Sequence, residues 1–262
     1  MERPEPPILV MGDVHGQLGK LLGHLRNSGL IDHAYDWSGG KARLFFLGDY
    51  VNRGPSGLDV LYLIRHLQEG AAHEGGQVLA LLGNHDACQL AARLFLNDSE
   101  RGPSQMESWI ANGGQREDVT GLDDELARWF SNLPALAIVD DTLLMHADSD
   151  FYLAYGESVD AINHEIGTVI GDRDPDAWST LLTRFGGRHV FDETTPGGKD
   201  RARVVLGMLG ADRLVHGHTP IDKVTGQRPE AVTQSFVYAK GMCVNADGGM
   251  YRGGPGFLVR LR

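Results

Sequence analysis

Five apolar segments of strand length end abruptly in side chains that can bind a metal ion, and no other feature of the chain constrains its fold so strongly. In chain order they are ILVMGDVHG (8–16), ARLFFLGD (42–49), VLALLGNHD (78–86), TLLMHAD (142–148) and RLVHGHTP (213–220). Their apolar parts are rich in leucine and β-branched residues and do not alternate with polar ones, which is typical of strands buried on both faces. The sequence therefore predicts a buried β-sheet core.

Helical periodicity separates the first of these segments. Apolar residues recur at helical spacing over 18–25 and again over 60–67. Strands that alternate with helices are typical of α/β proteins with parallel strands, and such sheets bind ligands beyond the carboxyl ends of their strands. Because all five segments carry Asp, Asn or His at that end, we expect these side chains to form one site.

The polar residues at the segment ends make a set of oxygen and nitrogen donors: Asp13, His15, Asp49, Asn84, His85, His146 and His218. This mixture suits manganese, iron, zinc and similar ions, and the lack of a thiolate in it argues against a structural zinc site. Seven donors are too many for one ion with an open position, but they fit two ions bridged by one carboxylate. Such a pair can supply a bridging hydroxide at neutral pH for in-line attack on phosphorus.

Composition excludes some classes of partner. The chain has 262 residues and a formal net charge of −11, and an acidic surface repels phosphate backbones, so we expect no nucleic-acid footprint. No apolar stretch approaches the ~20 residues needed to cross a bilayer, and the N-terminal MERPEPP does not resemble a secretory signal. Two cysteines are too few for a disulfide framework. We therefore expect a cytoplasmic protein without membrane contact.

The chain is expected to form a single domain over residues 1–262. Apolar residues at helical spacing, interrupted by NDSERGPSQ and NGGQ, predict a helical insertion at about 87–135. The tail MCVNADGGMYRGGPGFLVRL is predicted to contain two strands joined by a Gly-rich turn.

The motifs GDVHG, GDYVNRG, GNHD, LLMHAD and VHGHTP, in this order, resemble those of the calcineurin-like metallophosphoesterase superfamily. More narrowly, they are similar to its phosphoprotein phosphatase and symmetrical dinucleoside-tetraphosphatase branch. They run from residue 12 to residue 220, so the resemblance covers most of the chain. It implies an α/β fold, the four-layer α/β/β/α sandwich in which two mixed sheets pack face to face with helices outside.

The resemblance also implies roles for individual residues. The first metal ion would be held by Asp13, His15 and Asp49, with Asp49 as the bridge, and the second would be completed by Asn84, His146 and His218. His85 would protonate the leaving oxygen, and Arg53 would clamp the phosphate. A second phosphate-binding arginine is expected within LLTRFGGRHV, where both Arg184 and Arg188 qualify. Mn²⁺ is the expected ion at both positions, with Fe, Zn, Ni, Co and Mg as alternatives.

Pro220 stands where nuclease and phosphodiesterase members of the superfamily often carry a further histidine. The first ion would then have fewer protein ligands, as in the phosphoprotein phosphatase type.

Asn52 departs from the pattern of most phosphoprotein phosphatases, which have Asp before this arginine. That carboxylate supports the charged form of the general acid, so His85 beside Asn52 should lose its proton more easily. Tetraphosphatase relatives also have an uncharged residue here. The stretch points to substrates with good leaving groups or to relaxed substrate choice.

Several other polar residues have a structural interpretation. We expect His216 to pack or support the site, and Asn245 and Asp247 to fix a turn. For Asp86, a helix cap and support of the general acid both remain open. Asp148 would either support His146 or cap a turn.

The favoured hypothesis is a two-metal hydrolase of phosphate monoesters. One alternative is a hydrolase of phosphoanhydrides such as dinucleoside polyphosphates, and another is an inactive metal-binding scaffold. The phosphorylated substrate could be a phosphoprotein, a nucleotide or a small metabolite, and the sequence does not choose among them.

Overall fold

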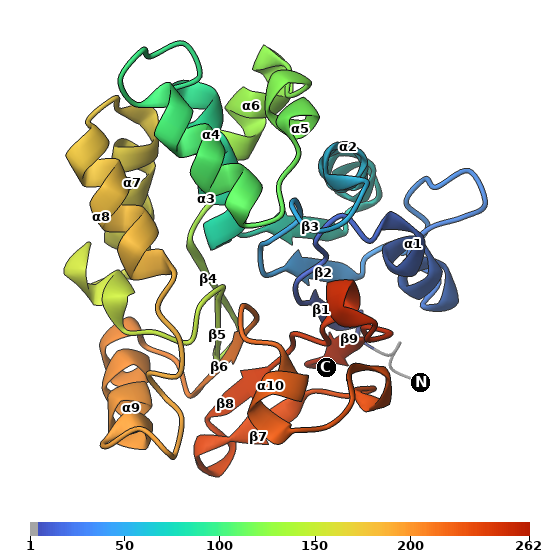
Figure 1. The fold of residues 1–262 in the computed structure, drawn as a ribbon. Helices are drawn as coiled ribbons and strands as arrows, with labels where there is room; N and C mark the ends of the chain where they lie inside the picture. The colour runs from blue at the N-terminus through green and yellow to red at the C-terminus, as the bar shows by residue number, and fades with distance from the viewer. Residues whose placement is uncertain (1–4) are drawn as a thin grey trace.

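Two mixed β-sheets form the centre of the fold in a computed structural model that describes residues 5–262 (Figure 1). The first sheet has four strands in the order β3-β2-β1-β9, and the second has five in the order β4-β5-β6-β8-β7. The first comprises β1 (Ile8–Met11), β2 (Arg43–Phe46), β3 (Gln77–Ala80) and β9 (Leu258–Arg260). The second comprises β4 (Leu136–Val139), β5 (Thr142–Met145), β6 (Arg213–His216), β7 (Phe236–Tyr238) and β8 (Cys243–Asn245).

The inner strands of both sheets are parallel, as the sequence predicts. Strand β1 pairs in parallel with β2, and β2 with β3, while β9 closes the sheet antiparallel to β1. In the second sheet β6 pairs in parallel with both β5 and β8, and β4 and β7 are antiparallel edges. The carboxyl ends of the five predicted strands consequently lie at one end of the sandwich.

Alternate residues of each inner strand bury different faces, which explains the continuous apolar runs. Ile8 and Val10 of β1 belong to the core between the sheets, together with Leu144 of β5 and Val215 of β6. The intervening residues of β1 and β2 pack against the outer helices in a second, larger core. Because both faces of each sheet are covered, the strands carry no polar stripe.

Helices cover the outer face of each sheet (Figure 1). On the side of the first sheet lie α1 (Leu18–Asn27) and α2 (Gly57–Glu74). On the side of the second lie α7 (Val159–Gly171), α8 (Pro175–Phe185) and α9 (Gly198–Leu209). The predicted α/β sandwich of two mixed sheets flanked by helices is confirmed.

Four helices follow β3 in the stretch for which a helical insertion is predicted, and they lie at the top of Figure 1. They are α3 (Asn84–Leu94), α4 (Gly102–Ala111), α5 (Arg116–Thr120) and α6 (Asp124–Ser131). Short helical turns complete the chain: η1 (Phe151–Ala154), α10 (Ile221–Thr225), η2 (Pro229–Ala231), η3 (Ala239–Gly241) and η4 (Met250–Arg252). No helix within residues 5–262 is long and apolar enough to span a membrane.

The two strands of the tail, β8 and β9, lie in different sheets and do not pair with each other. The Gly-rich segment between them carries the chain across the sandwich and includes η4. This crossing brings Tyr251 to the strand ends, with consequences for the site.

Candidate metal centre

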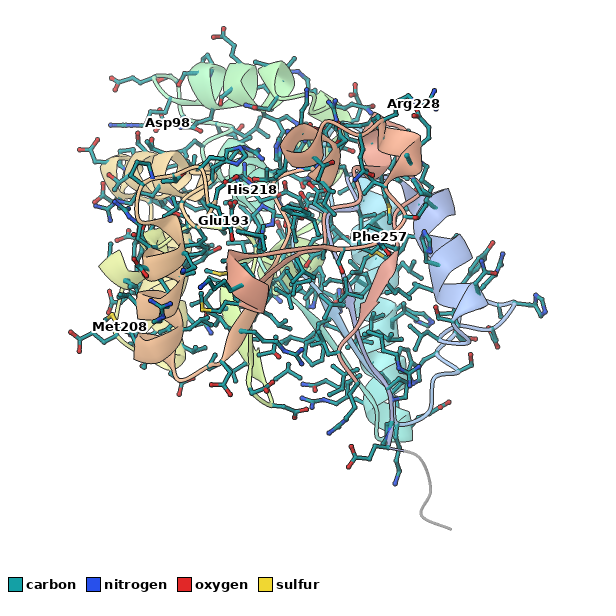
Figure 2. All side chains as sticks on the ribbon, turned by 90° about the horizontal axis from the view of Figure 1, so that it is seen from below. Asp98, Glu193, Met208, His218, Arg228 and Phe257 are labelled. Atoms are coloured by element: carbon teal, nitrogen blue, oxygen red, sulfur yellow. The ribbon has the colours of Figure 1, made fainter. Side chains whose placement is uncertain are left out.

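The six predicted metal ligands and the predicted acid, His85, converge where the strands of both sheets end. Asp13 and His15 follow β1, Asp49 follows β2, and Asn84 and His85 are the first residues of α3 after β3. The second sheet contributes His146 from the end of β5 and His218 from the end of β6. Figure 2 shows His218 in the interior of the molecule, whereas Asp98, Met208 and Arg228 lie at its periphery. All seven are buried except Asn84, which is partly exposed.

One candidate group for an ion contains His15, Asp49 and His85, whose donor atoms all lie within 4.8 Å of one another. The Nε2 atom of His15 is 3.5 Å from Asp49 Oδ2 and 3.8 Å from Asp13 Oδ2. Asp13 Oδ2 is buried without a hydrogen-bond partner among the described residues, while Asp13 Oδ1 accepts the backbone N–H of His218. Three donors from three strand ends thus form the group, and Asp13 Oδ2 lies beside His15.

A second candidate group contains Asp49, His146 and His218, again with donor atoms within 4.8 Å of one another. The Nε2 atom of His146 is 3.4 Å from Asp49 Oδ1, 3.0 Å from Asn84 Oδ1 and 3.1 Å from His218 Nδ1. Asp49 belongs to both groups and turns a different carboxylate oxygen to each. This is the geometry that a bridging ligand requires.

The protonation pattern of His146 and His15 fits cations at these positions. The Nδ1 atom of His146 lies 3.0 Å from the Leu47 carbonyl oxygen, so it must carry the hydrogen and leave a lone pair on Nε2. That lone pair faces two further acceptors, Asn84 Oδ1 and Asp49 Oδ1. His15 is fixed in the same way by the Val51 carbonyl oxygen. Converging acceptors repel one another unless a cation lies among them.

Burial favours the neutral form of the imidazoles and destabilises the ionised form of the carboxylates. It lowers the pKa of His15, His85 and His218 well below the usual value and that of His146 to about 3. It raises the pKa of Asp49 and of Asp13 well above the usual value, with the neighbouring carboxyls Asp86 and Asp247 adding to the effect. Divalent ions would offset the charge of both carboxylates.

The backbone at the site adopts conformations that few L-residues occupy. Five residues of the site have φ values in the left-handed region: His15 (46°), Asp49 (55°), Asn52 (71°), Arg53 (66°) and His218 (68°). Each such position costs on the order of 1–3 kcal/mol and persists only where the surrounding structure holds it. Strain of this kind clusters at functional sites, and here it turns side chains from separate strands toward one point.

Asp86 holds part of this strained backbone in place. Its carboxylate is fully buried and accepts the backbone N–H groups of Asp49 (2.8 Å), Tyr50 (3.0 Å) and Gly83 (2.8 Å). The bond to Gly83 caps α3, and the other two fix the GDY turn after β2. Of the two interpretations of Asp86 left open by the sequence, the helix cap describes the structure. Asp86 supports the backbone of Asp49 and Tyr50 and makes no bond to the His85 side chain.

Arg53 lies against two histidines of the first candidate group, His15 and His85. The guanidinium Nη1 of Arg53 donates to His15 Nε2 at 3.0 Å, and Nη2 donates to His85 Nε2 at 2.8 Å. The guanidinium also stacks 4.2 Å above the ring of Tyr251, whose edge meets the His15 ring. Sequence reasoning missed Tyr251, because it follows no strand end and only the crossing from β8 to β9 brings it there.

Asn52 is fully buried, but it does not hydrogen-bond His85. Neither atom of its amide group has a partner within residues 5–262, and the same holds for Nδ1 of His85. The side-chain oxygen of Asn52 instead lies against Gly113, where a Cβ atom would approach it to 2.9 Å. A hydrogen bond between Asn52 and His85 is therefore absent from the structure.

The structure separates the two arginines that the sequence left as alternatives. Arg188 donates to the carbonyl oxygen of His218, and its charge lowers the pKa of His146 and His218. Arg184 lies on α8 with its guanidinium 5.7 Å from the ring centroid of Tyr155. Only Arg188 reaches the candidate metal centre.

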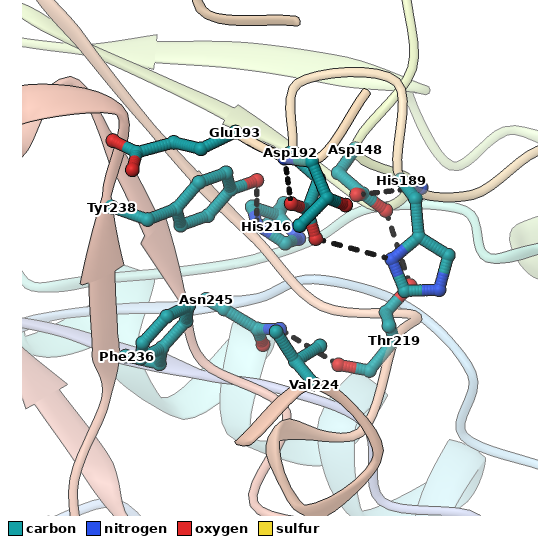
Figure 3. Close-up of a pocket in the computed structure, with 11 residues that line it drawn as sticks. Asp148, His189, Asp192, Glu193, His216, Thr219, Val224, Phe236, Tyr238 and Asn245 are labelled. Atoms are coloured by element: carbon teal, nitrogen blue, oxygen red, sulfur yellow. Dashed lines mark hydrogen bonds and ion pairs between the residues drawn. The ribbon is translucent and has the colours of Figure 1, made fainter. Parts of the chain in front are cut away.

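A cavity of about 230 Å³ lies at the end of β6, where His216 and Thr219 line it (Figure 3). Asp148 lines it and accepts the backbone N–H of His189 and the hydroxyl of Thr219, so it ties the segment after Arg188 to the end of β6. His216 lines it as well and lies 2.8 Å from the Tyr238 hydroxyl. Asp148 and His216 therefore contact residues next to the candidate metal ligands. Asp148 makes no hydrogen bond to His146.

Asn245 and Asp247 fix the turn after β8, as expected. The side-chain oxygen of Asn245 accepts the backbone N–H of Asp247, whose own carboxylate accepts that of Gly249. Asp247 is fully buried beside Asp13, and burial raises its pKa to about 6.

Comparison with known proteins connects this geometry to a family. The sequence profile described as calcineurin-like phosphoesterase matches residues 6–222. Shewanella-like protein phosphatase 2 of Arabidopsis thaliana is 32% identical over 108 residues, which are 41% of this chain and 27% of that protein. The symmetrical bis(5'-nucleosyl)-tetraphosphatase of Janthinobacterium sp. (strain Marseille) is 29% identical over 184 residues, 70% of this chain and 60% of that protein. The matches thus span less than two thirds of these relatives' own length.

A solved structure shares the fold over nearly the whole chain. The cold-active protein-tyrosine phosphatase of a psychrophile Shewanella sp. superposes with a TM-score of 0.73 at 23% identity, covering 99% of this chain and 76% of that chain.

Proposed function

The chain belongs to the calcineurin-like phosphoesterase family, and from this premise we propose that it is a two-metal phosphatase that hydrolyses phosphate monoesters. The observation that carries the proposal is Asp49, shared by two groups of buried donors, with Arg53 and His85 beside them. Neutral histidines and buried carboxylates suit divalent ions, and Mn²⁺ is the ion that we propose. When bound, the ions would supply a hydroxide nucleophile at neutral pH and neutralise charge on the phosphate.

The residues around the donors would bind the phosphate and protonate the leaving oxygen. Arg53 and Arg188 approach from different segments, and each presents a planar guanidinium that can bind two phosphate oxygens. Tyr251 holds the Arg53 guanidinium by stacking against it. His85 would donate a proton to the leaving oxygen. Its depressed pKa suits leaving groups that need little protonation.

A second candidate activity is the hydrolysis of phosphoanhydrides such as dinucleoside polyphosphates. Two observations favour it as the alternative: the uncharged Asn52 near the proposed acid, and the similarity to a symmetrical bis(5'-nucleosyl)-tetraphosphatase over 70% of this chain. Both substrates require the same donors, so the two activities differ in the leaving group rather than in the metal centre.

The test is hydrolysis of three substrates by the full chain. Phosphate release is measured for an aryl phosphate and a phosphopeptide, and formation of two ADP is measured by chromatography for diadenosine tetraphosphate. Mn²⁺, Zn²⁺, Mg²⁺ or a chelator would be present in parallel reactions. We expect Mn²⁺-dependent turnover of the aryl phosphate, and Asp49→Asn should abolish it while lowering the metal content at both positions. Exclusive turnover of diadenosine tetraphosphate would favour the second candidate. If protein loaded with two ions turned over none of the substrates, both candidate activities would be overturned. The chain would then be a metal-binding scaffold without activity.

A further inference from the structure

A groove of about 480 Å³ lies between helices α3, α6, α7 and α8. These helices are in the upper part of Figure 1. Three arginines line it, one from each of three segments: Arg93 on α3, Arg128 on α6 and Arg173 just after α7. We call it the arginine groove. Asp124 is the one carboxylate that lines it, so its side chains carry a surplus of two positive charges (three minus one) in a chain whose formal net charge is −11.

The guanidinium groups of the arginine groove have spare donors. Arg93 pairs with Asp124, but its Nε–H is buried without a hydrogen-bond partner among the described residues. Arg173 donates from Nη2 to the carbonyl oxygen of Leu94 at 3.0 Å. The structure gives neither Arg128 nor Arg173 an ion pair with any carboxylate in residues 5–262. Since each guanidinium has five N–H donors, most of those in the groove lack a protein acceptor.

Apolar side chains form the floor of the arginine groove. Leu90 and Ile170 are buried there, and Trp178 is packed beneath them with 1% of its surface exposed. A ligand that fills this volume would bring negative charge to the rim and an apolar or planar part to the floor. Free inorganic anions would satisfy only the first of these two requirements.

We propose that the arginine groove binds a small organic anion of the nucleoside diphosphate class. Arginine recognises phosphate by paired hydrogen bonds, and three guanidinium groups around one groove can share the oxygens of a diphosphate. The adjoining apolar floor accepts the base or another planar group. A dicarboxylate is also an anion but lacks both the phosphate geometry and the planar part.

The arginine groove is separate from the candidate metal centre. Asn84 and His85 begin α3, whereas Arg93 and Leu94 end it. Nine residues of α-helix span about 14 Å, so the two sites lie at opposite ends of one helix. Binding in the groove therefore requires neither metal nor turnover, and its test does not depend on the proposed phosphatase activity.

The test is isothermal titration calorimetry of the full chain after removal of metal with a chelator and dialysis. Chelation suppresses phosphate binding at the metal centre. The probes are ADP, inorganic pyrophosphate and succinate. We expect one ADP per chain, weaker binding of pyrophosphate because it has no planar part, and the weakest binding of succinate. Affinity for ADP should fall as salt rises.

Two variants locate the binding. The double variant Arg128→Glu with Arg173→Glu should weaken ADP binding by at least about tenfold, since it replaces two phosphate donors with like charges. The control Arg116→Glu makes the same charge change at an exposed arginine on α5 outside the groove, and should leave affinity within about twofold. Arg128 and Arg173 are exposed, so folding should persist, and circular dichroism checks this.

Absence of binding by ADP and pyrophosphate would overturn the proposal. So would equal affinity of the double variant and the wild-type chain, because the anion would then bind elsewhere. Tightest binding by succinate would replace the phosphate class with a dicarboxylate and overturn the diphosphate assignment.

Discussion

At the scale of single residues, side chains of the candidate metal centre are held by contacts with other side chains of the same site. Arg53 illustrates this, because its guanidinium meets two histidines through hydrogen bonds and a tyrosine ring through stacking. Asn52, its neighbour, is fully buried, whereas Arg53 is partly exposed, and Asn52 has no polar partner within the described chain. We therefore expect different effects from replacing Arg53 and from replacing Asn52.

Replacing Arg53 should reduce phosphate capture without loss of metal. We expect Arg53→Ala to lower kcat/KM for an aryl phosphate by at least about tenfold, equivalent to ~1.4 kcal/mol, because a bidentate phosphate contact is lost. The matched control is Arg184→Ala, which removes an arginine that lies against Tyr155 and should change kcat/KM by less than about twofold. Equal effects of the two substitutions would show that Arg53 does not bind phosphate.

Asn52→Asp should change the leaving-group preference. A carboxylate near His85 would favour its protonated form and oppose the pKa depression caused by burial. We expect activity on alkyl phosphates to rise relative to aryl phosphates, and the alkaline limb of the pH profile to move to higher pH. Asn132→Asp, which adds the same charge at an exposed position, is the control. An unchanged ratio with an unmoved limb would show that residue 52 does not tune the acid.

At the scale of secondary structure elements, the start of α3 and the turn after β2 are one unit. Asp86 joins them through three backbone N–H groups, and Gly83 approaches the Asp49 backbone so closely that a Cβ would lie 2.3 Å from its nitrogen. Asn84, His85 and Asp49 are positioned together by this unit. Its disruption should therefore affect stability before it affects chemistry.

We expect Asp86→Asn to lower the free energy of unfolding by roughly 1–3 kcal/mol. The amide NH₂ would face one of the three buried N–H donors and leave it unpaired. Urea unfolding in the presence of a chelator measures this without a contribution from metal. Asp118→Asn is a matched control: Asp118 is buried and has an unpartnered carboxylate oxygen, so its replacement should be nearly neutral. Similar stability of Asp86→Asn and the wild-type chain would contradict the role of Asp86.

At the scale of the whole molecule, the two sheets meet at a cluster of buried carboxylates and imidazoles, and metal should stabilise the folded chain. Asp13 and Asp49 have raised pKa values in the folded protein, so they retain protons that the unfolded chain releases. Their contribution to stability is therefore lost as pH rises through the folded pKa values, and a divalent ion replaces those protons. The histidines are already neutral, because burial lowers their pKa.

The increase in melting temperature caused by Mn²⁺, relative to a chelator, should consequently grow as pH rises from about 5.5 to about 7.5. Differential scanning fluorimetry at matched ionic strength measures it. Asp49→Asn should reduce the metal-dependent increase across this range, because the shared carboxylate is gone. A pH-independent increase would show that the raised carboxyl groups are not the ligands.

The sequence by itself determined the strands, the end of the sheet at which the site lies and the side chains that converge there. These follow from local rules: apolar runs predict buried strands, and parallel strands place their carboxyl ends together. The motifs indicated the family, and the family implied the four-layer α/β/β/α sandwich.

Tertiary structure decided which of Arg184 and Arg188 reaches the site, that Tyr251 stacks on Arg53, and that Asn52 makes no hydrogen bond to His85. It also assembled the arginine groove from α3, α6 and the end of α7. Each of these depends on how helices and loops from distant parts of the chain pack against one another. Local spacing fixes the face of an element on which a side chain lies, but not the element that will be packed against it.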